Sequence, residues 1–466
     1  MTDRFARRAL WSLLAVSALT LCPVAASAQT PASPAVEPSA PPPAESPAPP
    51  VGRPPPAPPA AAATVEAESY PRIGNNHEIF IGKSVWFRFG IQAQLWADWL
   101  QSSTPVNGND GSYSQNFFLR RARLIVGAQF LPTVSAYLLL DAPRIGQGTT
   151  ITTVTLNSDG TPVNTTTIGK RFGAQDGGGE GIADLWGEVK IAGDAFILDA
   201  GLMYVPLSRS VLTSSTTPLT LDVGNTSTLI PNTSGQRDIG VQLKGYVLED
   251  HLEYRVGLFS GARQAANATA GNPIGHNFFR ATGYLQYDLL DTEKGYVYGG
   301  HYFGKKRILG IGVGVDAQKN DAPQTEAYFA VSAALFGNFP LAGEPTKAGG
   351  DEIGFLAQYY HYDGGGAAGA VPTLLKQDDF LGEVAYYEKD LGFGLFGKFE
   401  MQKFGEAAKA GNTQWFGGGV RYYVYENICN FTLAYNRVQF PDAPTSGAGA
   451  KNATNEITLQ TQFYYY

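Results

Sequence analysis

Apolar and polar residues alternate along the chain from residue 85 onward. In the first such stretch the apolar frame is Val85, Phe87, Phe89, Ile91, Ala93, Leu95, Ala97 and Trp99, and the frame between includes Arg88, Gln92, Gln94 and Asp98. A period of two is that of a β-strand with one face in an apolar environment. The stretch is therefore predicted to be a strand, either half-buried in a soluble sandwich or placed between lipid and water.

Segments with this pattern recur to the C-terminus, each about 9 to 14 residues long and bounded by turn residues. The sixteen predicted strands are 85–100, 116–130, 134–142, 182–191, 195–206, 237–248, 251–260, 277–289, 306–318, 325–337, 351–362, 378–389, 392–404, 413–425, 428–440 and 455–466. The fold class predicted from them is all-β and antiparallel.

Strand and connection lengths favour a transmembrane barrel over a soluble sandwich. Tilted strands of about 9 to 11 residues cross the hydrocarbon layer, whereas soluble strands usually run about 5 to 6 residues. Barrels also alternate long outer loops with short periplasmic turns. The long early connections are 101–115, 143–181 and 207–236, and the short ones are 131–133, 192–194 and 249–250. Connections 290–305 and 338–350 break the rule, because they are long where short turns are expected.

Composition agrees with a barrel but leaves a large soluble all-β protein as the alternative. Charged residues make up 16% of the chain, below the roughly 25% of a typical soluble domain. The mean hydropathy is −0.13, and a barrel keeps this value low because half of its residues face a wet lumen. After the N-terminus, no apolar run approaches the roughly 20 residues of a membrane helix.

The N-terminal residues predict export. Arg4, Arg7 and Arg8 precede an apolar stretch, residues 9–26, and a small-residue cleavage signal, Ala26–Ala28. This order is typical of a secretory signal peptide, so residues 1–28 are predicted to be cleaved off. Residues 29–75 are rich in Pro and Ala, and we expect a disordered, extended periplasmic segment. A second interpretation is that residues 29–68 contact the cell wall and tether the outer membrane to it.

Residues 80–466 resemble the phosphate-selective porin O and P family of Gram-negative outer membranes. The resemblance depends on the order and spacing of several stretches. They are NFFLRRARLIVGAQF (Asn116–Phe130), ADLWGEVKI (Ala183–Ile191), Pro206-Leu207-Ser208, Leu212-Thr213-Ser214-Ser215, RDIGVQLKG (Arg237–Gly245) and EKGYVYGGHYFGKKRILGIGVGVD (Glu293–Asp316).

The resemblance implies a multi-pass, sixteen-stranded barrel in the outer membrane, in contact with its lipid and assembled as a homotrimer. It also implies that the third outer loop, here about 207–236, folds inward and narrows the pore. Guidance of small anions such as phosphate falls, by the same resemblance, to Arg and Lys side chains that face the lumen.

The chain shows no residue pattern typical of an enzyme, a metal site or a cofactor site, and no nucleic-acid partner is expected. Its five His residues are isolated, without metal-ligand spacing. Gly310, Gly312 and Gly314 lie in a segment with the alternating pattern of a strand, and no helix follows them. A nucleotide-binding loop is therefore disfavoured. Glycine there is better explained by crowding or barrel curvature.

Arg121 and Arg123 are the first candidates for the anion path. They share the polar frame of their strand, and the opposite frame is Phe118, Ala122, Leu124, Val126 and Ala128. Guanidinium groups stay charged and can grip phosphate oxygens in pairs. The further candidates are Arg88, Lys190, Arg209, Lys244, Arg280 and Arg421. The alternative for each is that it pairs with a lumenal carboxylate and stiffens the wall.

The charge balance does not by itself predict an anion channel. The whole chain has a formal charge of −7, and polar-frame acids such as Asp98, Asp141, Asp184 and Glu400 are about as numerous as the bases. Phosphate preference therefore depends on the resemblance alone. The other candidate functions are a general porin, or a porin for sugars or carboxylates. For sugars, the predicted stacking path is Trp86, Trp96, Trp186 and Tyr246. Packing within the wall is the other interpretation of these aromatic residues.

Overall fold

The computed structural model describes much of the chain beyond residue 71. The described ranges are 72–73, 78–101, 113–156, 162–170, 181–230, 233, 235–262, 278–319, 327–341, 343–365, 374–442 and 453–466, with only the backbone of 72–73, 148–156 and 162–170. The predicted signal peptide and residues 29–71 and 74–75 of the predicted periplasmic segment lie outside these ranges. Within the described ranges, no helix is long and apolar enough to cross a membrane.

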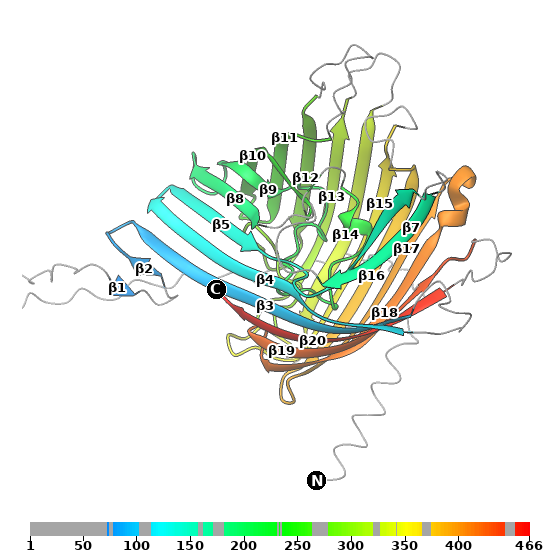
Figure 1. Ribbon diagram of the computed structural model, residues 1–466. Helices are drawn as coiled ribbons and strands as arrows, with labels where there is room; N and C mark the ends of the chain where they lie inside the picture. Colours follow the sequence, from blue (N-terminus) through cyan, green and yellow to red (C-terminus); the bar gives the residue numbers. More distant parts are fainter. Residues whose placement is uncertain are drawn as a thin grey trace, which may run out of the picture. The chain divides into compact units, whose positions relative to one another are not determined.

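Sixteen antiparallel strands form a closed barrel (Figure 1), which confirms the predicted fold class. They are β3 (Trp86–Gln101), β4 (Tyr113–Leu131), β5 (Val134–Asp141), β8 (Gly181–Lys190), β9 (Ile197–Tyr204), β10 (Arg237–Val247), β11 (Leu252–Phe259), β12 (Arg280–Asp288), β13 (Ile308–Gln318), β14 (Tyr328–Pro340), β15 (Glu352–Asp363), β16 (Gln377–Glu388), β17 (Phe393–Phe404), β18 (Thr413–Tyr425), β19 (Cys429–Gln439) and β20 (Ala453–Tyr465). Each overlaps the strand predicted from the alternating pattern.

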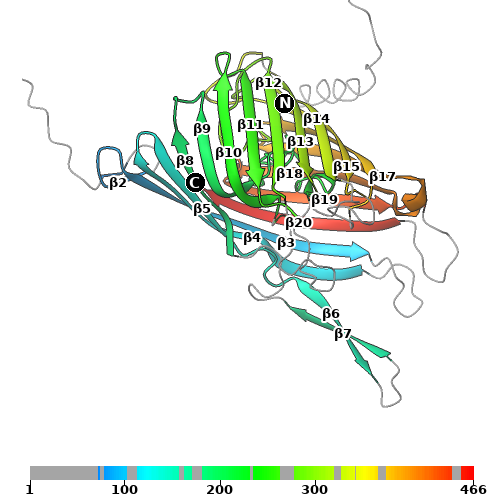
Figure 2. The same ribbon diagram turned by 90° about the horizontal axis from the view of Figure 1, so that it is seen from above.

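The first and last barrel strands pair with one another and close the ring. β20 lies beside β3 in Figure 2, and their register pairs Glu456 with Leu100 and Tyr465 with Ile91. Each strand therefore has a hydrogen-bonded neighbour on both sides, so the barrel has no open edge. This arrangement satisfies the backbone polar groups without water, as a membrane requires.

Four further strands lie outside this ring. β1 (Arg72–Ile73) pairs with β2 (Ile79–Phe80), which itself pairs with the start of β3. Ordered pairing thus begins before residue 80. The connection after β5 contains a separate hairpin of β6 (Gly148–Leu156) and β7 (Pro162–Lys170), which the sequence pattern did not predict.

The apolar frame of each strand points outward and the polar frame points into the barrel. In β10, Ile239 is 64% exposed, whereas Gln242 is 1% exposed. β13 follows the same rule, with Ile311 and Val313 on the exposed face and Asp316 buried. A soluble sandwich would bury the apolar frame, so this inversion fits strands whose outer face contacts lipid.

One strand departs from the predicted frames. The pairing of β3 with β4 shifts between Gln94 and Leu95, so that Gln94 lies opposite Arg121 and Leu95 opposite Leu119. Arg120 is the extra residue of this β-bulge. The prediction that Phe118 lies on the face opposite Arg121 is therefore wrong. Phe118 is 3% exposed and its ring lies near the ring of lumenal Trp96.

The largest hydrophobic cluster lies inside the barrel, between the wall and the segments that enter the lumen. Its members include Met203, Val205, Leu207, Val211, Leu212, Tyr284, Tyr298 and Tyr360. Loop 3, defined here as residues 205–236, supplies four of these side chains. The prediction of an inward-folded third loop is thereby confirmed, and Figure 1 shows this green segment within the ring of strands.

Candidate functional site

Loop 3 lies directly against the wall at its start. The Ser332 hydroxyl of β14 donates a hydrogen bond of 2.6 Å to the carbonyl oxygen of Leu207. A Cβ atom at Gly314 of β13 would overlap that same oxygen. The glycine therefore permits a close approach of the loop backbone, which agrees with the predicted role in relieving crowding.

Loop 3 then crosses to the opposite wall, where polar side chains hold its backbone. Gln462 of β20 donates a hydrogen bond to the carbonyl oxygen of Thr216 over 2.9 Å. Arg421 of β18 donates to the carbonyl oxygens of Pro218 and Thr220, over 3.1 and 2.5 Å. The strands that bind the loop thus lie on both sides of the lumen, and the loop spans it.

Asp222 is the acidic anchor of loop 3. Its two carboxylate oxygens form separate ion pairs, with Arg120 at 2.7 Å and with Arg121 at 2.6 Å. Burial by itself would raise the pKa of the Asp222 carboxyl, but the charges of Arg120 and Arg121 hold the pKa well below its usual range. Because of the bulge in β4, two consecutive arginines both reach the lumen.

Arg123 also binds loop 3, one position further along the same frame. It donates to the Ser215 hydroxyl over 2.6 Å and forms an ion pair of 2.7 Å with Asp141. The two arginines chosen first from the sequence, Arg121 and Arg123, are therefore both lumenal, and each is paired with a carboxylate.

A second segment enters the lumen from the other end of the barrel. The long connection between β12 and β13, residues 289–307, is called the inner turn here. Tyr298 and Glu293 of this segment are each 2% exposed. Its length, which broke the alternation of connection lengths, is explained by this inward fold.

The inner turn and loop 3 are joined through their backbones. Thr213 and Tyr298 form a parallel β-bridge. The Ser214 amide donates to the Tyr298 carbonyl oxygen, and the Tyr298 amide donates to the Leu212 carbonyl oxygen, each over 2.8 Å. The inner turn thus supports residues 212–214 of loop 3 from the opposite end of the barrel.

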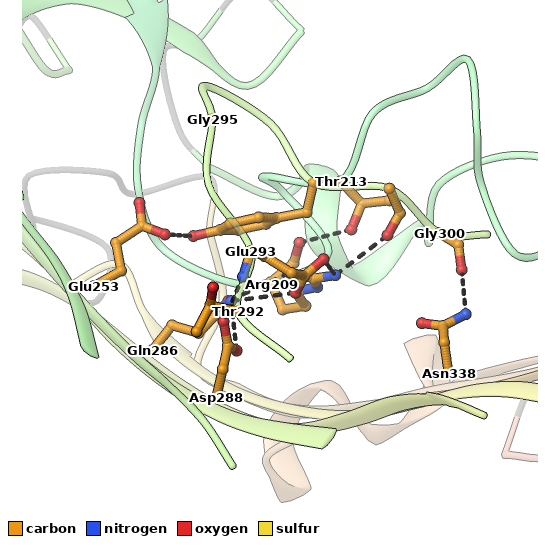
Figure 3. Close-up of polar contacts among 12 residues, drawn as sticks. Arg209, Thr213, Glu253, Gln286, Asp288, Thr292, Glu293, Gly295, Gly300 and Asn338 are labelled. Carbon is orange, nitrogen blue, oxygen red and sulfur yellow. Dashed lines mark hydrogen bonds and ion pairs between the residues drawn. The ribbon is translucent and has the colours of Figure 1, made fainter. Parts of the chain in front are cut away.

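Arg209 and Glu293 form a buried ion pair between these two segments (Figure 3). The two guanidinium nitrogens donate to the two carboxylate oxygens over 2.6 and 2.8 Å. The guanidinium also lies 4.1 Å from the centre of the Tyr298 ring and 4.2 Å from that of Phe336. A bidentate pair between two aromatic rings fixes both segments in one geometry.

The barrel wall holds the inner turn through Arg255 of β11. Arg255 donates to the carbonyl oxygens of Gly295 and Tyr296, each over 3.0 Å, and to Glu253 over 2.6 Å. The Tyr298 hydroxyl donates to Glu253 as well, over 2.6 Å, and Figure 3 shows Glu253 at the side of this cluster. The inner turn is therefore part of the packed interior.

A cavity of about 290 Å³ lies between loop 3 and the wall formed by β3, β4 and β17–β20. We call it the loop-3 cavity. Its aromatic lining consists of Trp96, Phe118, Phe396 and Trp415. Its charged lining consists of Arg120, Arg144 and Lys398 together with Asp98, Asp222 and Glu456. Three bases face three acids, so the cavity carries no large excess of either charge.

The remaining candidates from the sequence lie away from the loop-3 cavity. Lys244 forms ion pairs with Glu188 and Asp199, over 2.8 and 3.1 Å. Arg280 forms ion pairs with Asp238 and Asp316, over 3.3 and 3.2 Å. In these pairs the bases and acids of the polar frame lie next to one another across strands.

Lys190 and Arg88 lie toward the turn end of the barrel. The Lys190 side chain is 39% exposed and forms an ion pair of 2.9 Å with Asp194 in the next turn. Hydrogen bonds from Lys190 and then from Lys294 lower the pKa of the Asp194 carboxyl. The Arg88 guanidinium lies 4.0 Å from the centre of the Tyr466 ring.

Sequence reasoning missed Arg120, Arg144, Lys398 and Asp222 as lining of the cavity. Arg120 sits in the apolar frame of its strand and reaches the lumen only through the bulge. Asp222 lies in the predicted loop 3, where no periodicity indicates which way a side chain points. Lys398 shares a polar frame with Glu400, so the alternation places it in the lumen. The alternation does not show that Lys398 lines the cavity.

In the described part of the chain, no group of three or more His, Cys, Asp or Glu side chains is placed to hold a metal ion.

Solved structures with a similar fold include outer-membrane porins and channels. OprB of Pseudomonas putida has a TM-score of 0.50 at 9% identity, over 82% of this chain and 94% of its own. The outer membrane channel DcaP of Acinetobacter baumannii has a TM-score of 0.47 at 12% identity, over 83% and 99%. An anion-selective porin from Comamonas acidovorans has a TM-score of 0.45 at 9% identity, over 82% and 100%.

At these identities the similarity establishes the barrel fold alone. No protein-family model matches the chain, and no curated protein matches its sequence.

The Arg209–Glu293 pair yields a stability prediction. Glu293→Gln leaves the buried Arg209 charge without its carboxylate, so we expect a loss of about 3–5 kcal/mol in the free energy of unfolding. Thermal unfolding followed by circular dichroism measures it. The double variant Arg209→Met/Glu293→Leu removes both charges and is expected to recover most of the loss. Glu344→Gln, which affects an exposed pair with Arg307, is the control. A double variant as unstable as the single one would contradict the prediction.

The ion pairs of Asp222 yield a pH prediction. Because its pKa in the folded chain lies below the usual range, its stabilisation is complete above the unfolded-chain pKa of about 3.9. The stabilisation declines as the pH falls below that value, and it is gone once the pH is below the folded pKa. We expect the difference in unfolding midpoint between the wild type and Asp222→Asn to be constant from about pH 8 to 5 and to shrink below about pH 4. Thermal scans across that range test it, and a difference that disappears between pH 7 and 5 would refute it.

Proposed function

We propose that this chain is a passive outer-membrane channel, a porin, for small hydrophilic solutes. The observation that carries the proposal is the inverted barrel: its outer face is apolar, its inner face is polar, and an inward loop crosses the lumen beside a charged cavity. A pore selects by its width and by the fixed charges at its narrowest part. Loop 3 and the inner turn restrict the lumen in this barrel.

The proposed location is the outer membrane of a Gram-negative cell, reached by export through the N-terminal signal of residues 1–28. The proposal of contact between residues 29–68 and the cell wall concerns a segment outside the described residues, and it stays a prediction from composition.

Small anions, including phosphate, are the proposed preferred solutes. Arg120 and Arg144 line the loop-3 cavity together with Lys398, and Arg121 lies directly behind Asp222. Guanidinium forks match the oxygen atoms of phosphate and carboxylate. Fewer of the predicted residues therefore belong to the proposed anion path. Arg121 and Arg123 reach loop 3, whereas Lys244 and Arg280 pair with acids elsewhere in the wall.

A sugar or general porin is the second candidate, and the aromatic lining of the cavity favours it. Trp96 and Trp415 are both among the lining residues, and aromatic rings stack against the apolar faces of sugars. The predicted stacking path is interrupted, however. Trp186 is covered by the rings of Tyr137 and Tyr296, which supports packing as its role.

The function is tested by recording from single channels in planar lipid bilayers. Under a KCl gradient we expect a reversal potential whose sign indicates preference for chloride over potassium. We expect added phosphate to reduce the chloride current. Arg120→Gln should weaken both effects, whereas Glu344→Gln should leave them unchanged. Cation preference that phosphate does not alter would refute the anion part. Block by an oligosaccharide but not by phosphate would favour the second candidate.

We further propose a homotrimer. Strands β5 and β9 have 8 residues each, beside the 16 of β3 and the 19 of β4. An outer cavity of about 610 Å³ lies at this face, and its apolar lining includes Ile91, Ala93, Ala122, Leu124 and Leu140. A neighbouring copy would cover it. Light scattering from the purified protein in detergent is expected to give a trimeric protein mass, and a monomeric mass would contradict the proposal.

A further inference from the structure

Asp222 binds the lumenal arginines in the way that a solute carboxylate would. Each of its oxygens faces a different guanidinium, at 2.7 Å on Arg120 and 2.6 Å on Arg121. Its backbone belongs to loop 3, while both arginines belong to the barrel wall. The contact is therefore made by a segment that is separate from the wall, with the geometry of an oxyanion held by two cations.

The contact is open to the loop-3 cavity on one side. The Arg120 and Asp222 side chains are 21% and 16% exposed, whereas the Arg121 side chain is 5% exposed. Both Arg120 and Asp222 line the cavity. A solute in the cavity thus meets Arg120 and the carboxylate first, and Arg121 becomes accessible only when the carboxylate moves.

Arg144 adds a cation to the same cavity. Arg144 is exposed, and its guanidinium has no hydrogen bond or ion pair with another described residue, although its carbonyl oxygen accepts from the Gln147 amide over 3.1 Å. Its φ of +62° is in the left-handed region, which is uncommon for a residue other than glycine. An unpaired guanidinium held over the cavity in a strained backbone indicates a role beyond packing.

Charge balance favours exchange of Asp222 over addition of a further anion. With Asp222 in place, the three bases of the cavity already face three acids, Asp98, Asp222 and Glu456. An extra anion would meet this balanced set and the repulsion of Asp98 and Glu456. When a solute oxyanion replaces the Asp222 carboxylate, the two arginines keep an anionic partner, because one oxyanion group takes the place of another.

We propose that Asp222 is an internal substitute for the solute, and that a solute oxyanion, a carboxylate or a phosphate, displaces it from Arg120 and Arg121. The displacement releases the Asp222 side chain from β4 and enlarges the passage beside the loop. Arg144 holds the entering solute while the exchange occurs. This inference rests on the proposed function, since it assigns the solute class and the movable contact of the same channel.

Isothermal titration calorimetry of the purified full-length protein in detergent tests the proposal directly. Sodium succinate and sodium phosphate are titrated in separate experiments, with sodium chloride as the reference anion. Asp222→Asn removes the internal competitor, so we expect its affinity for at least one of the two oxyanions to rise about tenfold. Succinate and phosphate together distinguish the two sources of the oxyanion. Equal tightening for chloride would indicate a general charge effect and overturn the proposal.

Asp250→Asn is the matched control. It also removes one aspartate charge, from an exposed ion pair with Lys294 of the inner turn, and asparagine tolerates its positive φ of 70°. We expect its oxyanion affinity to equal that of the wild type. If Asp222→Asn binds no tighter than this control, Asp222 is a structural anchor only.

Arg144→Gln is a second test that remains valid if Asp222→Asn does not fold. The Arg144 guanidinium has no partner among the described residues, so its loss is not expected to disturb the fold. We expect it to weaken oxyanion binding severalfold, and unchanged affinity would count against the site. Calorimetry requires no ion flow, so its result is separate from the channel recordings. A selective channel with unaltered binding in Asp222→Asn would refute this inference alone, and a protein without conductance would refute the proposed function.

Discussion

A sixteen-stranded barrel encloses more space than its own side chains fill, and the rest of this structure depends on how loop 3 is held across that space. The loop binds the wall through Ser332 at its start, through Arg421 and Gln462 on the far side, and through the paired arginines at Asp222. Each contact satisfies a polar group that would otherwise be buried without a partner. Together these contacts hold the loop in the lumen.

The inner turn explains why loop 3 can lie so deep. Outer loops of a barrel have the wall as their only natural support, but here a segment from the opposite end meets loop 3 at Thr213 and Tyr298. The Arg209–Glu293 pair joins the two segments away from water, between two aromatic rings. Removing one partner leaves a buried charge, so the joint is stable only as a complete unit.

Pairing within the wall decides which charges a solute can meet. Lys244 and Arg280 are neutralised by acids on nearby strands, whereas Arg120 and Arg144 face the cavity beside loop 3. The negative charge of the whole chain is thus a poor guide to the field in the pore. In the proposed channel, selectivity depends on the few cations whose partners are displaced by the solute, and Asp222 is the partner that belongs to a loop.

The sequence by itself determined the strands and their inner and outer faces, because a period of two is a local property and lipid on one side makes it unambiguous. It also placed Arg121 and Arg123 in the lumen. The inward third loop was predicted from the family resemblance and not from the alternation. Only the tertiary structure decided that Phe118 and Arg120 turn inward, since the bulge between Gln94 and Leu95 depends on how two strands pair. The same holds for the inner turn and for Asp222, whose partners lie far away in the chain. Alternation cannot report contacts made across the lumen, and those contacts are what define the candidate site.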